Sequence, residues 1–115
     1  MVDSVLKTKT KWQGLEEEDR NIVIMPFMER GDLYQKMKKV IKIPHKAAQY
    51  FSQKLLSTFI YLSSKGILHR DIKPENILLG DRFEPLLIDF GFSCTCGHKC
   101  RFVGDARFAA PELFR

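Results

Sequence analysis

The feature that most constrains the fold of this chain is an amphipathic segment between Pro44 and Gly66. Apolar residues recur in it at intervals of three and four, which is the spacing of one face of an α-helix. The face consists of Ala47, Phe51, Leu55, Phe59 and Leu62, and it is widened by Ala48, Leu56 and Ile60. Proline suits the first turn of a helix, and glycine suits the left-handed residue that follows the last turn. The sequence therefore predicts a long helix whose apolar face needs a packing partner.

Shorter elements are expected before this helix. Residues Val2 to Trp12 and Ile22 to Phe27 have the composition of strands, and the polar, acidic segment 14–20 between them predicts a turn. Asp32 is placed to cap a short helix through residues 33–37, because its carboxylate can accept a hydrogen bond from a backbone N–H of the first turn.

A β-hairpin is expected after the long helix. Two apolar runs, Ile77–Leu79 and Leu86–Ile88, flank a Gly-Asp-Arg sequence at 80–82 that favours a tight connection. From Asp89 onward the composition predicts loop. The chain thus combines a small sheet with helices, which is the α+β class.

Composition limits the class of protein. The 115 residues are 44% hydrophobic and 29% charged, which fits one small globular domain and argues against disorder. The longest apolar run, Ile22 to Met28, is too short to cross a bilayer. The N-terminus lacks the apolar core of a signal peptide, so we expect an intracellular, cytoplasmic protein that does not bind membranes or nucleic acid.

A lysine-rich stretch accounts for much of the net charge of +5. Its members are Lys36, Lys38, Lys39, Lys42 and Lys46. Such a run is more often a solvated face than a binding patch, and the sequence leaves both open.

Three short motifs carry the chemistry. HRDIKPEN stands at 69–76, DFG at 89–91 and APE at 110–112. In this order, behind a long helix and around a hairpin, they resemble the signature set of the protein kinase family. Any one tripeptide could occur by accident in a helix–loop–hairpin protein, whereas the ordered set is specific.

The resemblance implies an ATP- and Mg²⁺-dependent enzyme that transfers the γ-phosphoryl group to a protein hydroxyl. Asp71 would orient the incoming hydroxyl and accept its proton. Lys73 would place positive charge on the transferring group, and a lysine here is typical of the serine/threonine kinases. Asn76 and Asp89 would supply the hard oxygen ligands that magnesium prefers. The expected catalytic residues are thus Asp71, Lys73 and Asn76.

A nucleotide site is implied by the same resemblance. Residues 22–33 are similar to the family's hinge between its two lobes, where backbone groups meet the adenine. The implied nucleotide contacts are Met25, Pro26, Met28, Asp32, Leu78 and Ile88. Asp32 could serve as a helix cap as well as a ribose ligand, and Leu78 and Ile88 as bare apolar residues are equally core.

The resemblance also predicts an incomplete kinase domain. Residues 1–25 would be the remnant of the N-lobe strands, 26–32 the hinge and 33–115 the start of the helical C-lobe. The glycine-rich loop, the lysine-bearing strand and the αC glutamate would precede this segment, so a complementing kinase fragment is an expected partner. We expect the isolated chain to expose Phe51, Leu55 and Phe59, to aggregate and to be poorly active.

Two positions depart from the family pattern. Asp105 stands where the family usually has a threonine that bridges the lysine and aspartate of the catalytic loop, so a carboxylate is added beside Asp71. Glu112 would lack its arginine partner, which the family places further along the chain. The segment VGDARFAAPELF at 103–114 loosely resembles the calcium/calmodulin-dependent-kinase-like group.

Arg70 is the family's usual partner for a phosphate on the activation segment, and binding backbone carbonyls is its alternative role. Ser93 and Thr95 are the only hydroxyls there, and both lie early in it. We therefore do not expect activation by phosphorylation of this segment.

A cluster of Cys94, Cys96, His98 and Cys100 has residue types that bind zinc. Alternate positions of an extended chain point to opposite sides, so one site would need a turn at Gly97. The pattern favours free thiols over a zinc site.

Two rival functions remain open at this point. The chain could be a pseudokinase that binds nucleotide or partners, or an inactive remnant of a kinase. The presence of Asp71, Lys73, Asn76 and Asp89 argues against lost chemistry.

Overall fold

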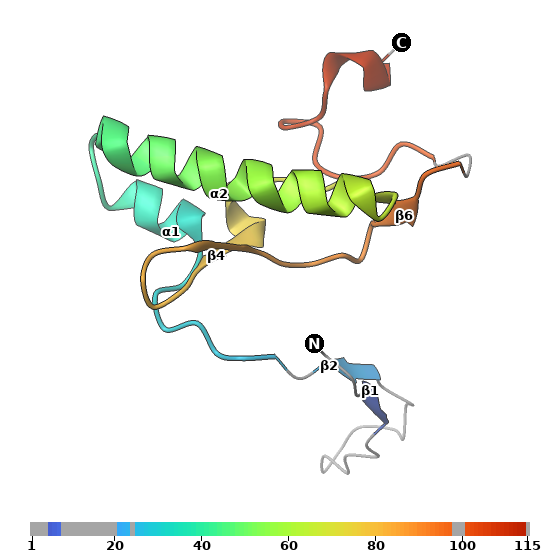
Figure 1. Ribbon diagram of the computed structural model, residues 1–115, viewed down its shortest axis with the longest axis horizontal. Coiled ribbons are helices and arrows are strands. Elements are labelled where there is room, and N and C mark those ends of the chain that lie inside the picture. The colour runs from blue at the N-terminus through green and yellow to red at the C-terminus, as the bar shows by residue number, and fades with distance from the viewer. Residues whose placement is uncertain (1–4, 8–20, 24, 98–100, 115) are drawn as a thin grey trace, which may run out of the picture.

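The long helix dominates the structure, a computed structural model that describes residues 5–7, 21–23, 25–97 and 101–114 (Figure 1). Helix α2 spans His45–Ser64, with Pro44 as its N-cap residue and Lys65 as its C-cap residue. Gly66 follows with a φ of 66°, the left-handed conformation that glycine adopts without steric cost. The predicted helix is therefore confirmed at both ends.

A six-residue helix, α1 (Leu33–Lys38), lies near the start of α2 (Figure 1). Its N-cap is Asp32, whose Oδ1 accepts a hydrogen bond of 2.8 Å from the backbone N–H of Gln35. This bond satisfies one of the free donors of the first turn. The predicted cap is confirmed.

The predicted hairpin is present, with its second strand shifted by one residue. Strands β4 (Ile77–Leu79) and β5 (Pro85–Leu87) are antiparallel, and Leu78 lies opposite Leu86. Ile88 lies just beyond β5, and its N–H donates a 2.9 Å hydrogen bond to the carbonyl of Asn76. The hairpin is tied to the entry of α1 by a bridge between Asp32 and Leu78.

The prediction of loop from Asp89 onward is wrong at two places. Strand β6 (Cys94–Thr95) pairs antiparallel with β3 (Ile67–Leu68), directly after α2. The second place is a 3₁₀ turn, η2, which spans Pro111–Phe114. Another 3₁₀ turn, η1, lies earlier in the chain and spans Pro74–Asn76. Strands of two residues are too short to show a periodic pattern, so only the fold reveals them.

At the N-terminal end, β1 (Val5–Lys7) pairs antiparallel with β2 (Asn21–Val23). The rest of the predicted strand at 2–12 lies outside the described residues, and the second predicted strand ends early, since residues 25–28 carry no strand. The predicted turn at 14–20 lies outside the described residues. An extended segment leads from β2 to α1 in Figure 1.

The core lies where α2 crosses the hairpin. Among the described residues, the buried apolar side chains are Leu62, Ile77 and Leu79. Phe51, Leu55 and Phe59 are half-buried, so the expected exposure of these three residues is only partial.

The most exposed apolar residues of α2 lie on a different side of the helix from Phe51 and Phe59, which are half-buried. Leu56 is 59% exposed and Ile60 is 62% exposed. No helix of the described chain combines the length and the apolar content needed to cross a membrane.

Candidate active site

The segment between β3 and β4 folds into a fixed loop around Asp71 and Asn76. The two side chains are 5% and 6% exposed. The amide Nδ2 of Asn76 donates to both the backbone carbonyl and Oδ2 of Asp71, each at 2.9 Å. Pro74 suits the first position of η1, and the N–H of Asn76 donates to the carbonyl of Lys73 within that turn. The loop thus holds the Asp71 carboxylate in one orientation.

His69 connects this loop to the residue that follows β5. Its Nδ1 accepts a 3.1 Å hydrogen bond from the backbone N–H of Asp71, so its Nε2 is the protonated nitrogen. Nε2 donates to the carbonyl of Ile88 at 2.8 Å. The ring also makes an edge contact with Phe90, with centroids 4.7 Å apart. The histidine therefore joins the Asp71 loop to the segment that carries the DFG motif.

Lys73 lies between two carboxylates. Its Nζ is 3.7 Å from Oδ2 of Asp71 and 3.7 Å from Oδ2 of Asp105. The lysine side chain is 23% exposed, so it is only partly covered by its neighbours. The structure thus brings Asp71, Lys73 and Asn76 together, as the motif spacing predicts.

Arg107 is a site residue that the sequence reasoning missed. Its Nε donates to Oδ1 of Asp105 at 3.0 Å, and its Nη2 donates to Oδ2 at 2.7 Å, a two-point contact. Its backbone N–H donates to the same carboxylate at 3.1 Å. The Asp-x-Arg spacing at 105–107 is the only sequence signal for this pair.

These contacts change the charge balance beside Asp71. The hydrogen bonds from the side chain and backbone of Arg107 hold the pKa of Asp105 well below its usual range, with the positive charges of Arg107 and Lys73 adding to the effect. The same contacts raise the pKa of Arg107. Nη2 of Arg107 also lies 3.7 Å from Oε1 of Glu75. The carboxylate at 105 is therefore charged and balanced, rather than an uncompensated negative charge.

Asp89 stands next to this cluster without bonding to it. Its φ is 59°, a left-handed conformation, and its Oδ1 accepts a 3.1 Å hydrogen bond from the N–H of Gly91. Ile88, the residue before Asp89, donates its N–H to the carbonyl of Asn76, so the backbone of Asp89 lies close to that of Asn76. Within the described chain, no hydrogen bond joins the Asp89 and Asn76 side chains.

The two residues fit a magnesium ion by their chemistry. Both hydrogen bonds of Asn76 use its amide nitrogen, so its amide oxygen is the atom left for a cation in the described part of the chain. Asp89 has a second carboxylate oxygen beyond the one bonded to Gly91. Magnesium needs few protein ligands because it keeps waters and binds phosphate oxygens.

The zinc question rests on residues that are only partly described. Cys94 is half-buried and Cys96 is exposed, while His98 and Cys100 lie outside the described residues. The preference for free thiols stays a prediction.

The expected nucleotide residues are spread along the entry to α1 and the hairpin. Met25 is 53% exposed and Pro26 is exposed, whereas Met28 is half-buried and its carbonyl accepts a 3.1 Å bond from Gly31 N–H. The bridge between Asp32 and Leu78 brings these two together. Leu78 and Ile88 are half-buried. Among the described residues, no hydrogen bond or β-bridge links Met25 or Pro26 to Asp32, Leu78 or Ile88.

Arg70 holds the following segment by its backbone. Its Nε donates to the carbonyl of Phe92, and its Nη1 donates to the carbonyl of Arg101 at 3.0 Å. Gly104, with a φ of 100°, packs so tightly on the Arg70 carbonyl that a Cβ at this position would collide with it. The carbonyl-binding role of Arg70 is therefore confirmed, and its phosphate-binding role stays a prediction.

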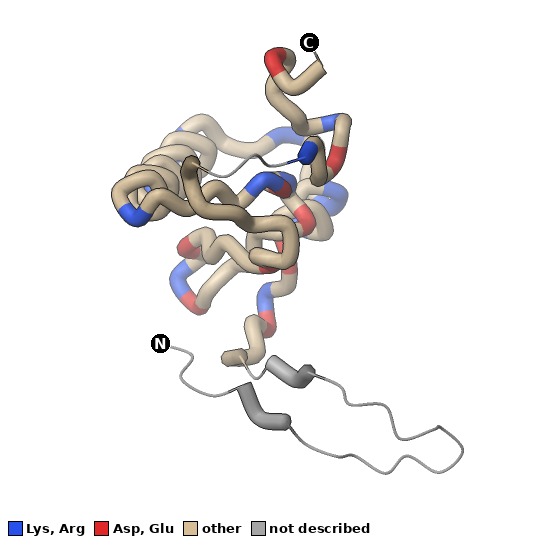
Figure 2. The backbone as a smooth tube through the Cα atoms, turned by 90° about the vertical axis from the view of Figure 1, so that its right-hand side faces the viewer, with Lys and Arg blue, Asp and Glu red and all other residues tan. Residues whose placement is uncertain are grey.

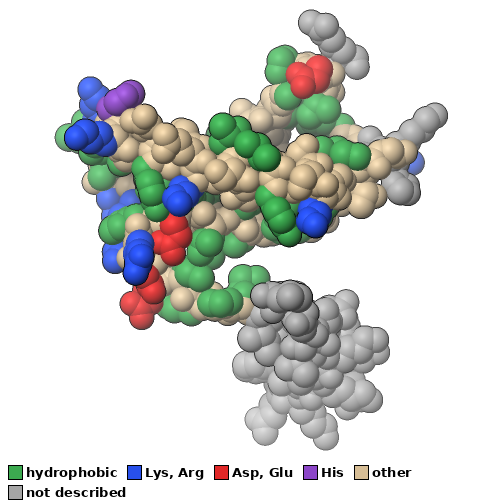
Figure 3. All heavy atoms as spheres, in the orientation of Figure 1, with side chains coloured by type: hydrophobic (Ala, Val, Ile, Leu, Met, Phe, Trp, Pro, Cys, Tyr) green, Lys and Arg blue, Asp and Glu red, His purple; other side chains and the backbone are tan. Residues whose placement is uncertain are grey.

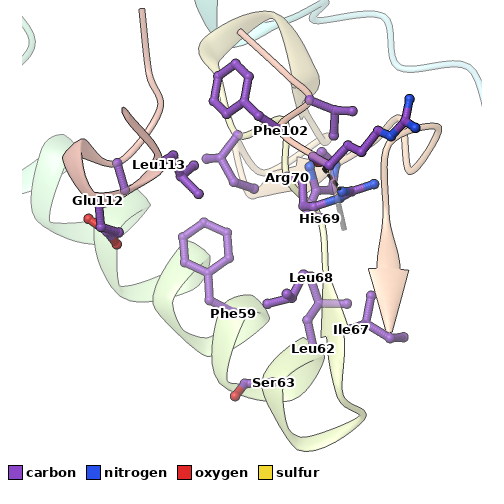
Figure 4. A pocket seen from close by; sticks show the side chains of 14 residues that line it. Phe59, Leu62, Ser63, Ile67, Leu68, His69, Arg70, Phe102, Glu112 and Leu113 are labelled. Carbon is purple, nitrogen blue, oxygen red and sulfur yellow. Dashed lines mark hydrogen bonds between the residues drawn. The ribbon is translucent and has the colours of Figure 1, made fainter. Parts of the chain in front are cut away.

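An apolar pocket of about 770 Å³ lies between α2, the 69–72 loop and the segment 101–113. Figure 4 shows Phe59 of α2 pointing into this pocket toward Leu113 of η2. Glu112 lies at its margin, exposed and without an ion pair to another described residue. A smaller cavity of about 140 Å³ lies beside Asp71 and Asp105.

Comparison with known proteins agrees with this geometry. The family model for the protein kinase domain matches residues 7–115. The chain is 32% identical over 105 residues to the cAMP-dependent protein kinase catalytic subunit of Schizosaccharomyces pombe, which covers 89% of this chain and 20% of that protein. It is 35% identical over 97 residues to the serine/threonine-protein kinase chk1 of the same yeast, covering 79% of this chain and 20% of that protein.

A third relative is the liver/testis isoform of the phosphorylase b kinase gamma catalytic chain of Mus musculus. It is 34% identical over 96 residues, covering 81% of this chain and 24% of that protein. The chain thus spans about a fifth to a quarter of the length of these relatives. The ordered motifs, the bonded Asp71–Asn76 loop and the family match agree: this chain belongs to the protein kinase domain family, with ATP-dependent serine/threonine kinases among its relatives.

Proposed function

We propose that this chain provides the catalytic loop of a serine/threonine kinase that transfers the γ-phosphoryl group of ATP to a protein hydroxyl. The observation that carries the proposal is the Asp71 carboxylate, held by Asn76 at 2.9 Å with the Lys73 ammonium 3.7 Å away. Positioning and charge neutralisation are what phosphoryl transfer requires from a protein. The protein substrate carries the acceptor serine or threonine.

Asp71 is proposed to orient the acceptor hydroxyl. The bonds from Asn76 and Lys73 engage Oδ2, so Oδ1 is the oxygen that can accept the hydroxyl proton. The N–H of Asp71 bonded to His69 and the carbonyl bonded to Asn76 prevent the loop from rotating. A hydroxyl held in this way lies in line for attack and loses its proton to the carboxylate late in the step.

Lys73, Asn76 and Asp89 are proposed to manage the phosphate charge. Lys73 is held between two carboxylates and would balance the charge of the transferring group. Asn76 and Asp89 would hold Mg²⁺, which supplies further neutralisation of the triphosphate when it is bound.

The nucleotide is proposed to lie against the entry to α1 and the hairpin. Its proposed contacts are Met25, Pro26, Met28, Asp32, Leu78 and Ile88. Pro26 keeps the backbone carbonyl that an adenine amino group needs, although it lacks an N–H. Asp32 would bind the ribose with the oxygen that does not cap α1, since only Oδ1 bonds to Gln35.

Phosphate transfer and nucleotide binding, both measured with a complementing N-lobe fragment present, together test the proposal. Asp71→Asn keeps the shape of the side chain but removes the proton acceptor, so we expect transfer from radiolabelled ATP to fall at least about a hundredfold. Magnesium-dependent binding of a fluorescent ATP analogue should survive Asp71→Asn and weaken strongly in Asp89→Asn. Asp81→Asn, in the exposed turn of the hairpin, is the matched control and should change neither.

The outcomes also separate the rival functions. Magnesium-dependent nucleotide binding without transfer would mean a pseudokinase, and no nucleotide binding would mean an inactive remnant. Either result overturns the proposal.

A further inference from the structure

A second concave surface, which shares no lining residue with the Asp71 loop, lies between α1, the start of α2 and the turn of the hairpin. It has a volume of about 610 Å³. Its apolar lining is Leu33, Met37, Val40, Ile43, Pro44, Ala47, Tyr50, Phe51, Leu79 and Phe83. We call this surface the α1–α2 groove. None of the roles proposed above uses it, apart from the start of α1 at Leu33.

The rim of the groove is basic. Lys36, Lys46 and Arg82 are its only charged lining residues, and no acidic residue lines it. In the sequence, no Asp or Glu occurs between Asp32 and Asp71. The same stretch contains seven lysines, Lys36, Lys38, Lys39, Lys42, Lys46, Lys54 and Lys65. Asp81 and Glu84 of the hairpin turn lie close to Arg82 without lining the groove, so the groove lining itself is cationic while acidic side chains stand beside it.

The pictures agree with this distribution. In Figure 3, lysine and arginine side chains gather around the end of the molecule where α1 and the beginning of α2 lie, next to hydrophobic side chains. In Figure 2, the coil of α2 carries blue segments and no red ones. Cationic and apolar groups thus share one face.

Apolar side chains beside these cations are open to solvent. Val40 is 45% exposed, and Ile41, next to it, is fully exposed. Phe83 is 40% exposed and has a φ of 60°, a costly conformation for a bulky residue. The guanidinium of Arg30 lies 4.0 Å from the centre of its ring, a cation–π contact that holds the ring at the groove. A strained, exposed aromatic residue beside a hollow is a feature of binding surfaces.

We propose that the α1–α2 groove binds a short amphipathic, acidic segment of a partner protein. Leucine-like side chains of that segment would enter the hollow over Val40, Ile43 and Leu79, and its carboxylates would meet Lys36 and Lys46. Charge complementarity selects an acidic partner, and the aliphatic floor selects apolar anchors. A hollow lined in this way suits inserted side chains better than it suits a flat lipid surface or a phosphate backbone.

Fluorescence anisotropy with two peptide probes tests the proposal on the full chain. The first probe is a short labelled peptide of glutamate and leucine, and the second has every leucine replaced by serine at the same charge. We expect saturable binding of the first and at least about tenfold weaker binding of the second, because the second lacks the anchors. Binding of the first should weaken as salt is raised.

Matched variants locate the binding surface. Lys36→Glu with Lys46→Glu should weaken the first probe about tenfold, whereas Lys65→Glu, at the other end of α2, should not. Val40→Ser should weaken it, and Leu56→Ser, at a still more exposed apolar residue that lies on α2 outside the groove, should not. Circular dichroism of each variant checks that the helices remain.

Three outcomes would overturn the proposal. The first is equal binding of both probes, which would show that charge alone, without apolar anchors, accounts for the binding. The second is tighter binding of phosphatidylserine vesicles or single-stranded RNA through the same lysines. The third is no binding of the first probe at low salt. Because these measurements use no ATP, their failure is distinguishable from failure of the kinase proposal.

Discussion

At the scale of single residues, the unusual feature is the carboxylate at position 105. A second acid near Asp71 would by itself repel the phosphates of a nucleotide. In the structure, the guanidinium of Arg107 makes two hydrogen bonds to Asp105 and so offsets the negative charge of that carboxylate. Asp105 can then hold Lys73 without adding a free negative charge to the site. Asp105 thus stands where the family pattern has a neutral threonine, and Arg107 balances its negative charge.

Removing the arginine should release this balance. In Arg107→Gln, we expect the pKa of Asp105 to rise toward the ordinary aspartate value of about 4. Since pairing lowers the folded-state pKa, the stability it contributes is present above pH about 4 and is lost as the pH falls toward the lowered pKa. Carboxyl NMR titration of wild type and Arg107→Gln measures the shift. Arg82→Gln is the control, and an equal shift in that variant would contradict the assignment.

Gly104 is the residue at which a single methyl group should matter most. Both Gly104 and Gly97 have φ near 100°, so an alanine at either site carries a similar backbone cost of about 1–2 kcal/mol. A Cβ at 104 also collides with the Arg70 carbonyl, while a Cβ at 97 meets no atom of the described residues within 4 Å. We therefore expect Gly104→Ala to lower the melting temperature clearly more than Gly97→Ala, and to impair transfer. Equal effects in calorimetry would refute the close packing of Gly104 on the loop.

At the scale of elements, strong local signals were sufficient to predict structure. The i, i+4 apolar repeat gave α2, Asp32 gave the cap of α1, and two apolar runs gave the hairpin with a one-residue shift. Strands β3 and β6 have only two residues each, and they exist because the chain after α2 meets the chain after the DFG motif. Such pairing depends on tertiary contact, so no local pattern predicts it.

Asp32 offers a way to separate an element's stability from a ligand contact. Asparagine caps helices as well as aspartate does, so Asp32→Asn should leave the free energy of unfolding within about 0.5 kcal/mol. Asp32→Ala should cost about 1 kcal/mol in urea denaturation, because the Gln35 N–H loses its acceptor.

Nucleotide affinity, measured on the same two variants, tests whether Asp32 also contacts the ligand. If Asp32 binds the ribose, Asp32→Asn should weaken ATP several-fold although its stability is unchanged. A variant that keeps both stability and affinity would remove Asp32 from the nucleotide site.

At the scale of the whole molecule, the site assembles residues from distant parts of the chain. Motif order predicted that Asp71, Lys73 and Asn76 would meet, and the structure places the Asn76 amide 2.9 Å and the Lys73 ammonium 3.7 Å from Oδ2 of Asp71. Motif order did not predict that Arg107 and Gly104 would fix the Asp71 loop. Both residues lie in the long segment after the DFG motif, and the sequence does not specify the path of that segment. The proposed roles of Asp89 and of the hinge residues remain predictions.

The amount of buried apolar surface also belongs to this scale. Few large side chains of the described residues are fully buried, and the radius of gyration is 17.1 Å, against about 13 Å for a compact domain of this length. A small core gives little stability against a large entropic cost. The expected aggregation of the isolated chain therefore stays a prediction with a physical basis.

The central claim is that Asp71, Lys73, Asn76 and Asp89 share one bound nucleotide. A crystal structure of the protein with Mg²⁺ and a non-hydrolysable ATP analogue tests it most directly. The account predicts oxygens of Asn76 and Asp89 at about 2.1 Å from the ion, and Lys73 beside the terminal phosphate. A nucleotide bound elsewhere, or an ion that touches neither Asn76 nor Asp89, would contradict it.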